Sequence, residues 1–512
     1  MTSRRALRSG ALGLVSSVVI GVASAGPAYS ITATLGLVVA GVGLQAPIIV
    51  LIAFVPMLLV AVGYRELNYA DPDCGTTFVW ATRAFGPFWG WMSGWAIVVA
   101  DVLVMASLAQ VSGQYTFLLF GAHGIGSDPT SGWVLALGIA FMVAMTFIAL
   151  RGIDLSARVQ TALLAVEFVM LVVFAAVALI RVAIGNAASG SITPAWSWFD
   201  PFQIHSFSTL VNATLLMVFI YWGWDSVVSV NEETVDSRRT PGRSAIIATI
   251  TLVALYILVT VAAQAYAGVG TEGSGLANPD HVDDVLGALG AAVFGSGWIG
   301  SILTHLLIIM VLTSAAASTQ TTILPTSRTT FSMALHRALP DRFANVHPRY
   351  LTPTVSTVAF GVVSALLYVV LNGFSGGSLI VDAVSAIAMS VGFYYGMTGL
   401  SCTWLYRSQF RHNPRALLIR GVVPGLGGAM LLFAAGWTAV TSWAADSGES
   451  SLTLPFAPHW QIGGVFLLGV GSMALGLPLY LLTRAAMPAY FRGEVIPRAL
   501  PVETDVAEET AR

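Results

Sequence analysis

Twelve apolar segments, each long enough to cross a lipid bilayer, occupy most of this 512-residue chain. A membrane-spanning helix needs about 20 consecutive, mostly apolar residues. Only 9% of the residues are charged, too few to cover the surface of a soluble protein of this length. We therefore predict an all-α integral membrane protein with 12 transmembrane helices, and we exclude a soluble enzyme, a nucleic-acid-binding protein and a disordered scaffold. The expected spans are 11–40, 43–63, 87–119, 132–150, 158–182, 206–230, 243–268, 297–326, 353–372, 379–405, 418–441 and 461–484.

The first segment has two interpretations. Arg4, Arg5 and Arg8, an apolar stretch and the sequence ASA at 23–25 are together typical of a cleaved signal peptide. The apolar character, however, continues past this point to Gly41. This continuation favours a first transmembrane helix with a cytoplasmic N-terminus.

The placement of the arginines predicts the orientation of the chain. Cytoplasmic loops of membrane proteins carry an excess of positive charge. With the N-terminus inside, alternate loops collect the arginines, and only Arg181 lies near the outer side. The outer loops instead contain Asp128, Asp200, Glu272, Asp280, Asp283, Asp284, Asp446 and Glu449. We therefore expect both termini in the cytoplasm. The richness in Gly, Ala and Arg and the lack of Lys indicate a GC-rich bacterial source, and hence the cytoplasmic membrane of a bacterium.

Three segments are expected to lie outside the bilayer. Residues 73–86 predict a short amphipathic helix at the inner surface, and residues 277–295 predict a helix in an outer loop. The tail, residues 485–512, contains prolines and several glutamates and is expected to be cytoplasmic and disordered. Cys74 and Cys402 are too few and too far apart in sequence to predict a disulfide or a metal site.

Two spans contain residues that interrupt a helix. The first reads GVASAGP over 21–27, where Pro27 lacks an amide donor and small residues flank it. The sixth reads FIYWGWD over 219–225, with Gly223 among aromatic residues and Asp225 two positions later. Irregular backbone at membrane depth persists where it lines a cavity or is buried in protein, so matching interruptions in two halves predict a transport site. The alternatives are a proline kink between packed helices in the first span and an interfacial position for Asp225 in the sixth.

Two longer stretches resemble a known family. These are FIYWGWDSVVSVNEETVDSRRTPGRSAI at 219–246 and STQTTILPTSRTTFSMALHRALPDRFANVHPRYLTPT at 318–354. They are similar to the sixth helix, and to the eighth helix with its following loop, of the amino acid–polyamine–organocation superfamily. The likeness covers most of residues 11–405. The first span departs from it, because many relatives carry Gly-x-Gly, an apolar pair and a later Pro where this chain has GVASAGP.

The resemblance implies a leucine-transporter-like fold with discontinuous helices 1 and 6. Residues 1–405 would form the transporter core, with inverted repeats at about 11–182 and 206–405. Residues 406–484 would add two transmembrane helices. In such carriers a substrate carboxylate meets amides of helix 1, and an ammonium group meets carbonyls of helices 1 and 6. Carried over, the substrate-binding residues are Gly21, Ser24, Ala25, Gly26, Phe219, Tyr221, Trp222 and Gly223, to which the buried acids Asp101 and Asp225 are added.

The coupling ion is predicted from helix 5. Some proton-coupled relatives place a lysine there, but this chain contains no lysine, and the corresponding position is Glu167 within an apolar run. Because burial disfavours a charged carboxylate, we hypothesise that Glu167 binds and releases a coupling proton near Ser318 and Thr319. The alternatives are a protonated Glu167 that only hydrogen-bonds a neighbouring helix, and a sodium site formed by Ser318 and Thr319 with carbonyls of helix 1.

The leading functional interpretation is a secondary transporter of amino acids or related amines, coupled to protons, that works by alternating access around helices 1 and 6. Asp101 and Asp225 together would favour a cationic ligand. An exchanger or polyamine carrier, a sodium symporter and a membrane nutrient sensor that does not transport remain as alternatives. The chain shows no metal-ligand spacing, nucleophile elbow or phosphate loop, so we expect no enzyme activity, no metal and no cofactor besides the coupling ion. The expected partners are the small-molecule substrate and the lipid bilayer.

Overall fold

Helices make up most of the molecule. The computed structural model describes residues 7–375, 378–456 and 458–501. Ten helical stretches in these residues are long and apolar enough to cross a membrane. They are Leu14–Ala70, Pro87–Leu119, Gly132–Leu150, Ile153–Ala183, Thr240–Ala267, Trp298–Leu335, Thr354–Gly373, Leu379–Leu405, Pro414–Thr441 and Gly464–Ala486. The protein is therefore a multi-pass helical membrane protein, as the apolar segments predict.

The expected total of twelve spans depends on two regions that the ten stretches do not separate. The first stretch comprises α1 (Leu14–Ser24), α2 (Pro27–Val42) and α3 (Ala46–Ala70), and so covers two expected spans. The sixth expected span contains α9 (Phe207–Tyr221) and α10 (Ser226–Ser229), and α9 alone is only 15 residues long. The twelve-span count thus remains a prediction.

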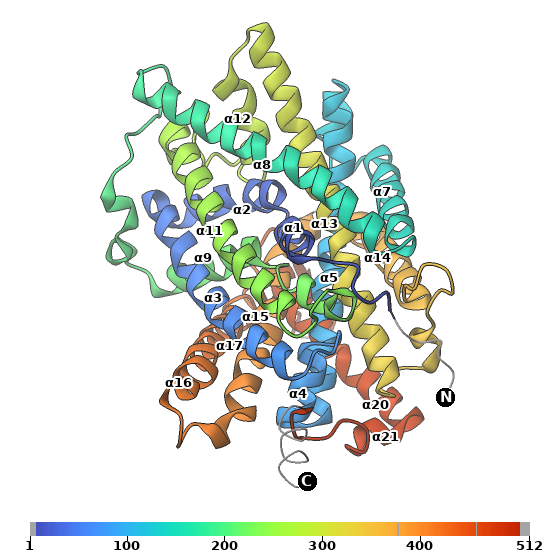
Figure 1. Ribbon diagram of the computed structural model, residues 1–512. Coiled ribbons are helices and arrows are strands. Elements are labelled where there is room, and N and C mark those ends of the chain that lie inside the picture. Colours follow the sequence, from blue (N-terminus) through green and yellow to red (C-terminus); the bar gives the residue numbers. More distant parts are fainter. Residues whose placement is uncertain (1–6, 376–377, 457, 502–512) are drawn as a thin grey trace.

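The longest helices surround α5 (Pro87–Leu119) at the centre of the molecule (Figure 1). Helix α5 packs against α13 (Trp298–Leu335) and α15 (Ser378–Leu405), and α11 (Thr240–Ala267) packs against α3 and α8 (Ile153–Ala183). The other long helices are α7 (Gly132–Leu150), α14 (Thr354–Ser375), α17 (Val423–Thr441) and α20 (Gly476–Ala486).

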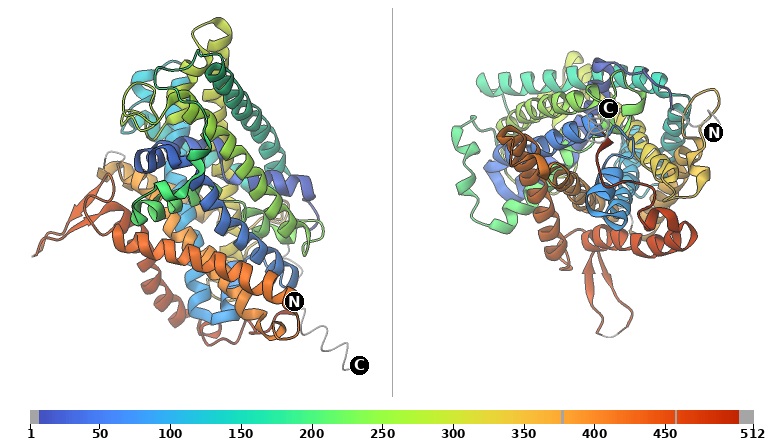
Figure 2. Two further views of the ribbon diagram at one scale, coloured as in Figure 1. Left: turned by 90° about the vertical axis from the view of Figure 1, so that its left-hand side faces the viewer. Right: turned by 60° about the horizontal axis from the view of Figure 1, so that its bottom comes forward.

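Short helices and one hairpin complete the described chain. The hairpin pairs β1 (Ser451–Thr453) with antiparallel β2 (Gln461–Gly463) and projects from the bundle (Figure 2). The short helices are α4 (Thr77–Phe85), α6 (His123–Gly126), α12 (Val285–Phe294), α16 (Pro414–Ala416), α18 (Gly464–Phe466), α19 (Ser472–Ala474) and α21 (Pro488–Phe491). Helices α4 and α21 lie at one end of the molecule and α12 lies at the other (Figure 1).

Both predicted non-spanning helices are present, as α4 and α12. Helix α4 is more buried than an interfacial helix would be, since eight of its nine residues are buried. Its basic residue is neutralised within the fold, because Arg83 Nε donates to Asp71 Oδ2 at 2.7 Å. The Thr77 hydroxyl of α4 also lies 2.6 Å from the Thr398 hydroxyl of α15.

The expectation of a disordered tail is wrong for residues 488–501. Tyr490, Ile496 and Leu500 are all buried against the helices. Arg83 Nη1 donates to the carbonyls of Pro497 at 2.8 Å and Ala499 at 3.1 Å. The prolines and glutamates of the tail conceal these three widely spaced apolar anchors, so composition alone predicts disorder. Residues 502–512 lie outside the described residues.

Candidate functional site

The first helix break follows directly from the sequence Ser24-Ala25-Gly26-Pro27. Helix α1 ends at Ser24, and Gly26 takes the left-handed conformation with φ +53°. Glycine adopts this conformation without the steric cost of a Cβ, and proline is well suited to the first position of the helix that follows. Pro27 accordingly opens α2. A Cβ at Gly26 would lie 3.1 Å from the Ser318 Cβ, so α13 packs closely against this break.

The second break lies between α9 and α10 and packs against the first. Trp222 is extended after the end of α9, and Gly223 has φ +114°. A Cβ at Gly223 would lie 2.7 Å from both the carbonyl carbon and the carbonyl oxygen of Ser24. The hydroxyls of Ser24 and Ser226 are 2.7 Å apart. The two interruptions therefore meet backbone to backbone, and only glycine permits this approach.

A small acidic cavity of about 10 Å³ lies where the two breaks meet. It is lined by Ser24, Asp101, Trp222, Gly223, Asp225, Ser226, Thr322, Pro325 and Tyr394. None of these nine residues is cationic, whereas two are carboxylates. A space of this volume holds at most about one water molecule, so the helices pack tightly around it.

Hydroxyl groups hold both carboxylates in place. Asp225 Oδ1 accepts a hydrogen bond from Tyr395 at 2.7 Å, and its Oδ2 accepts one from Tyr394 at 3.2 Å. The Trp222 indole donates to the Tyr394 hydroxyl at 2.5 Å, so α15 is joined to the second break at two points. Asp101 accepts a hydrogen bond from Thr326 of α13. Because these donors are neutral, the cavity retains the negative charge of any ionised carboxylate.

Glu167 joins α8 to the start of α2 and to α13. Its Oε1 accepts the Ala28 amide at 2.7 Å and the Ser314 hydroxyl at 2.6 Å. Ser314 in turn accepts the Tyr29 amide at 3.1 Å. The first amides of a helix have no partner within the helix, and they favour a nearby negative charge. Glu167 Oε2 is buried without a hydrogen-bond partner among the described residues, which leaves one oxygen available to carry a proton.

The two residues predicted to accompany Glu167 differ in position. The Ser318 hydroxyl donates to the Ser24 carbonyl at 3.1 Å and so reaches the first break. Thr319 donates instead to the Ala315 carbonyl of its own helix at 2.7 Å. Ser318 lies one helical turn after Ser314, the residue that contacts Glu167. The structure thus connects Glu167 to the break through α13 and leaves Thr319 outside this connection.

The predicted substrate-binding residues separate into two groups of five. Those that line the cavity are Ser24, Asp101, Trp222, Gly223 and Asp225. Those that do not are Gly21, Ala25, Gly26, Phe219 and Tyr221. A Cβ at Gly21 would meet Ala248 of α11 at 3.1 Å, and Tyr221 donates to the Val50 carbonyl of α3 at 3.0 Å. Ala25 and Gly26 shape the break, and Phe219 packs its ring between Tyr29 and Trp222.

Sequence reasoning missed the contribution of α15. Tyr394 and Tyr395 are both buried, and each hydrogen-bonds Asp225. The available signal was a pair of phenolic hydroxyls near the middle of an expected span, where a polar group needs a partner. Ser226, Ser314, Thr322 and Thr326 were also missed, because their facing depends on helix rotation.

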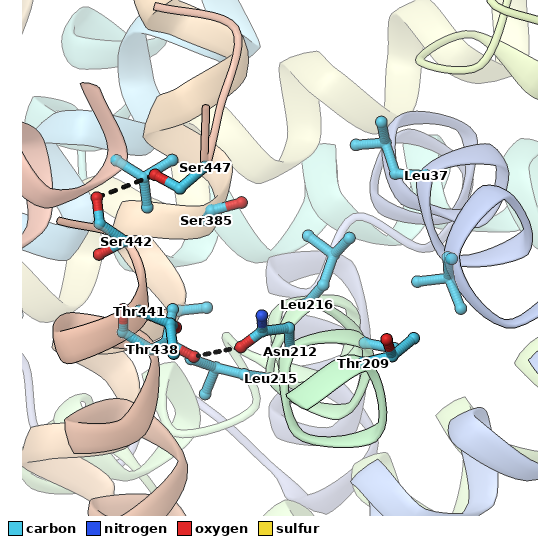
Figure 3. A pocket seen from close by; sticks show the side chains of 15 residues that line it. Leu37, Thr209, Asn212, Leu215, Leu216, Ser385, Thr438, Thr441, Ser442 and Ser447 are labelled. Atoms are coloured by element: carbon cyan, nitrogen blue, oxygen red, sulfur yellow. Dashed lines mark hydrogen bonds between the residues drawn. The ribbon is translucent and has the colours of Figure 1, made fainter. Parts of the chain in front are cut away.

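A larger pocket lies between α2, α9, α15 and α17 (Figure 3). Its volume is about 310 Å³, and none of its 15 lining residues is charged. The Thr438 hydroxyl donates to Asn212 Oδ1 at 3.2 Å across it, and the Ser447 hydroxyl donates to the Ser442 carbonyl at 2.9 Å (Figure 3). Trp222, the residue that follows α9, lines the acidic cavity, so α9 connects the two spaces.

The α4 end is held together by charges and backbone bonds. Arg328 pairs with Glu233 at 3.0 Å, and both side chains are almost fully buried. The Ala11 and Leu12 amides donate to the Glu233 carbonyl at 2.8 and 3.1 Å. Burial opposes ionisation of Asp73, but hydrogen bonds from His336 and Ser332 hold the pKa of its carboxyl below the ordinary value. These contacts close the end of the molecule opposite the larger pocket.

Two interrupted helices meet around a small, acid-lined cavity inside a bundle of long apolar helices, and this arrangement is that of the leucine-transporter fold. The solved structure of MhsT in complex with L-phenylalanine shares this fold, with a TM-score of 0.58 and 18% identity, over 82% of this chain and 98% of that chain. The chain belongs to the amino acid permease family, whose model matches residues 9–466.

Characterised and uncharacterised transporters resemble the chain over most of its length. An uncharacterized transporter of Mycobacterium tuberculosis is 29% identical over 440 residues, which is 85% of this chain and 89% of that protein. The branched-chain amino acid permease BcaP of Bacillus subtilis is 25% identical over 420 residues, covering 78% and 81%. The low-affinity putrescine importer PlaP of Escherichia coli is 25% identical over 370 residues, covering 71% and 75%. These likenesses indicate a transporter and not an enzyme.

Proposed function

We propose that this permease is a secondary transporter that couples the movement of an amino acid or related amine to protons. The observation that carries the proposal is the position of Glu167. A single buried carboxyl group receives the first amide of α2 and the Ser314 hydroxyl of α13, so its charge acts directly on the helix that forms one wall of the break. A proton that binds to Glu167 weakens the electrostatic attraction between this carboxylate and the start of α2. This change can shift the equilibrium between two arrangements of the break.

Alternating access around the two breaks is the accompanying proposal. Twelve spans, with five-span inverted repeats at about 11–182 and 206–405 and both termini in the cytoplasm, place α4 inside and α12 outside. The larger pocket then opens toward the outside, whereas the Arg328–Glu233 pair closes the inner end. This arrangement would place the acidic cavity between an outward-facing pocket and an inner end held together by the Arg328–Glu233 pair.

Uptake into proteoliposomes tests the proposal. The purified protein is reconstituted without sodium, and a panel of labelled amino acids and diamines is offered with and without an inside-alkaline pH gradient. Gradient-driven accumulation of one compound is the expected result. Uptake only against preloaded substrate would replace the symporter by an exchanger. A strict need for sodium would shift coupling to Ser318. Saturable binding without uptake under any gradient would favour a sensor.

A cationic substrate is a second candidate that the cavity specifically favours. Asp101 and Asp225 both line it, and no lining residue balances their charge. Desolvating a cation is offset only when an opposite charge or polar ligand receives it. A diamine or a cationic amino acid satisfies this requirement better than a neutral zwitterion does.

Asp101→Asn is expected to reduce the uptake of a cationic substrate at least tenfold. Removing one charged partner from a buried pair costs about 3–5 kcal/mol. A tenfold reduction corresponds to only about 1.4 kcal/mol, so it is a lower limit. The measurement is the concentration of an unlabelled diamine that halves the uptake of the labelled substrate. This concentration is compared between the wild type and Asp101→Asn. Asp446→Asn, in an exposed loop, is the matched control. Equal diamine inhibition in Asp101→Asn and the wild type would remove Asp101 from the recognition of cations.

A further inference from the structure

A thiol and two carboxylates meet at the α4 end of the molecule, outside the cavity already described. Asp73 and Cys74 lie in the loop between α3 and α4, and Glu232 lies just after α10. One ligand atom from each of the three lies within 4.8 Å of the other two. Asp73 and Glu232 are half-buried, so the cluster remains open to water on that side, whereas Cys74 is fully buried.

The carboxylates in and around this cluster are not all paired with positively charged side chains. The neighbouring Asp71 pairs with Arg83, and Glu233 pairs with Arg328. Asp73 pairs with His336, whose Nε2 lies 2.8 Å from Oδ2. Within the described residues, Glu232 forms no ion pair. It accepts the Cys74 amide at 3.3 Å, and the Cys74 thiol lies close enough to hydrogen-bond it as well. One carboxylate of the cluster is therefore left without a matched positive charge.

Oxygen and sulfur atoms at the same place have lone pairs that the hydrogen bonds do not use. The Asn231 side-chain nitrogen donates to the Asp73 carbonyl at 3.2 Å, but the oxygen of the same amide is buried and has no hydrogen-bond partner among the described residues. The Cys74 thiol makes a long contact, 3.6 Å, to the Arg328 carbonyl and also lies within hydrogen-bonding reach of Glu232. Asp73 receives three donors, from Gly75, Ser332 and His336, whereas a carboxylate offers about four lone-pair positions.

We propose that Cys74, Asp73 and Glu232 form a binding site for a soft divalent cation of the zinc type. Thiolate and carboxylate ligands together are typical of zinc, and a thiolate disfavours calcium and magnesium. The His336 hydrogen bond orients the Asp73 carboxylate, as partners behind a metal ligand commonly do. On binding, the Cys74 thiol gives its proton to water, and the metal gains one sulfur and two oxygen ligands.

The bound cation would link two parts of the chain that are 158 residues apart. It would join the loop after α3 to the segment after α10, next to the buried Arg328–Glu233 pair. A ligand that binds one arrangement more tightly than another shifts the population toward that arrangement. The cation would therefore stabilise the closed α4 end. The inference concerns binding and does not depend on the proposed transport function.

Cadmium binding to the purified full-length protein tests the site. The protein is freed of metal with a chelator and titrated with Cd²⁺, and both the heat of binding and the ultraviolet cadmium–thiolate absorption are followed. We expect one Cd²⁺ per chain with a thiolate band in the wild type. The chain offers a matched control, because its other cysteine, Cys402, is also free and buried.

Cys402→Ser is expected to bind like the wild type, whereas Cys74→Ser should lose the thiolate band and bind at least tenfold more weakly. Glu232→Gln should retain the band and bind about tenfold more weakly. Zn²⁺ should raise the unfolding temperature of the wild type and of Cys402→Ser but not that of Cys74→Ser, which also verifies that each variant folds. The absence of a band in the wild type, or a band of equal strength in Cys74→Ser, would overturn the proposal.

Discussion

Glu167→Gln should abolish accumulation driven by a pH gradient while it leaves substrate exchange intact. The glutamine carbonyl can still accept the Ala28 amide and the Ser314 hydroxyl that Glu167 Oε1 accepts at 2.7 and 2.6 Å. The link between α8, α2 and α13 is therefore conserved. The variant loses only the ability to exist in a charged and a neutral form. Because the hydrogen bonds remain, substrate should still cross the membrane, but a pH gradient should no longer drive it.

The expected size of the effect follows from the energy of the gradient. One pH unit corresponds to about 1.4 kcal/mol per proton, or about a tenfold concentration ratio. With one proton carried per substrate, wild-type proteoliposomes should reach about tenfold accumulation for each unit of gradient. The variant should reach a ratio of about one, with exchange against preloaded substrate retained. The measurement is the internal concentration at steady state.

Glu494→Gln is the matched control for this prediction, because Glu494 is exposed and pairs only with the neighbouring Arg492. It should accumulate substrate like the wild type. If Glu167→Gln also accumulates substrate in response to the gradient, Glu167 is only a structural hydrogen-bond acceptor. If accumulation in both proteins follows sodium instead, Ser318 is the residue to examine, since its hydroxyl reaches the first break.

The residues that interrupt the two helices can be recognised in the sequence because their effects are local. Pro27 lacks an amide hydrogen wherever it stands, and Gly223 between two tryptophans indicates a backbone that needs freedom. The sequence does not show which side chains face the cavity. Tyr221 and Trp222 are adjacent in sequence, yet Tyr221 bonds to α3 whereas Trp222 bonds to Tyr394 beside the cavity. That difference arises because Tyr221 is the last residue of α9 whereas Trp222 is extended, and an apolar run of residues does not show where the helix ends.

Contacts between residues that are distant in sequence were the hardest to predict. The partners of Asp225 lie 169 and 170 residues away, on α15. Cys74 and Glu232 approach each other only because the loop after α3 folds against the segment after α10. The spacing rules that identify metal sites apply to neighbouring ligands, so Cys74 read alone predicts nothing. Tail residues Ile496 and Leu500 show the same limit, since their burial depends on surfaces of other helices.

Gly223→Ala should cause a large loss of uptake through a purely steric effect. The position has φ +114°, a backbone conformation that residues with a side chain adopt at a cost of about 1–3 kcal/mol. The added methyl group would also lie 2.7 Å from the Ser24 carbonyl carbon and oxygen, and overpacking of this kind costs about 1–3 kcal/mol. The two breaks would have to separate. We expect the initial rate of uptake of the substrate found in the panel to fall at least tenfold.

A second glycine separates the two causes. Gly121 also has a positive φ, +73°, but a Cβ there would meet nothing within 4 Å. Gly121→Ala therefore carries the backbone cost without the collision, and it should retain most of the wild-type rate. The comparison is made at equal amounts of reconstituted protein, with thermal unfolding of both variants measured in parallel. If the two variants transport equally well, the contact between Gly223 and Ser24 does not limit the cycle. If only Gly223→Ala fails while it still unfolds cooperatively, the close approach of the two broken helices is what transport requires.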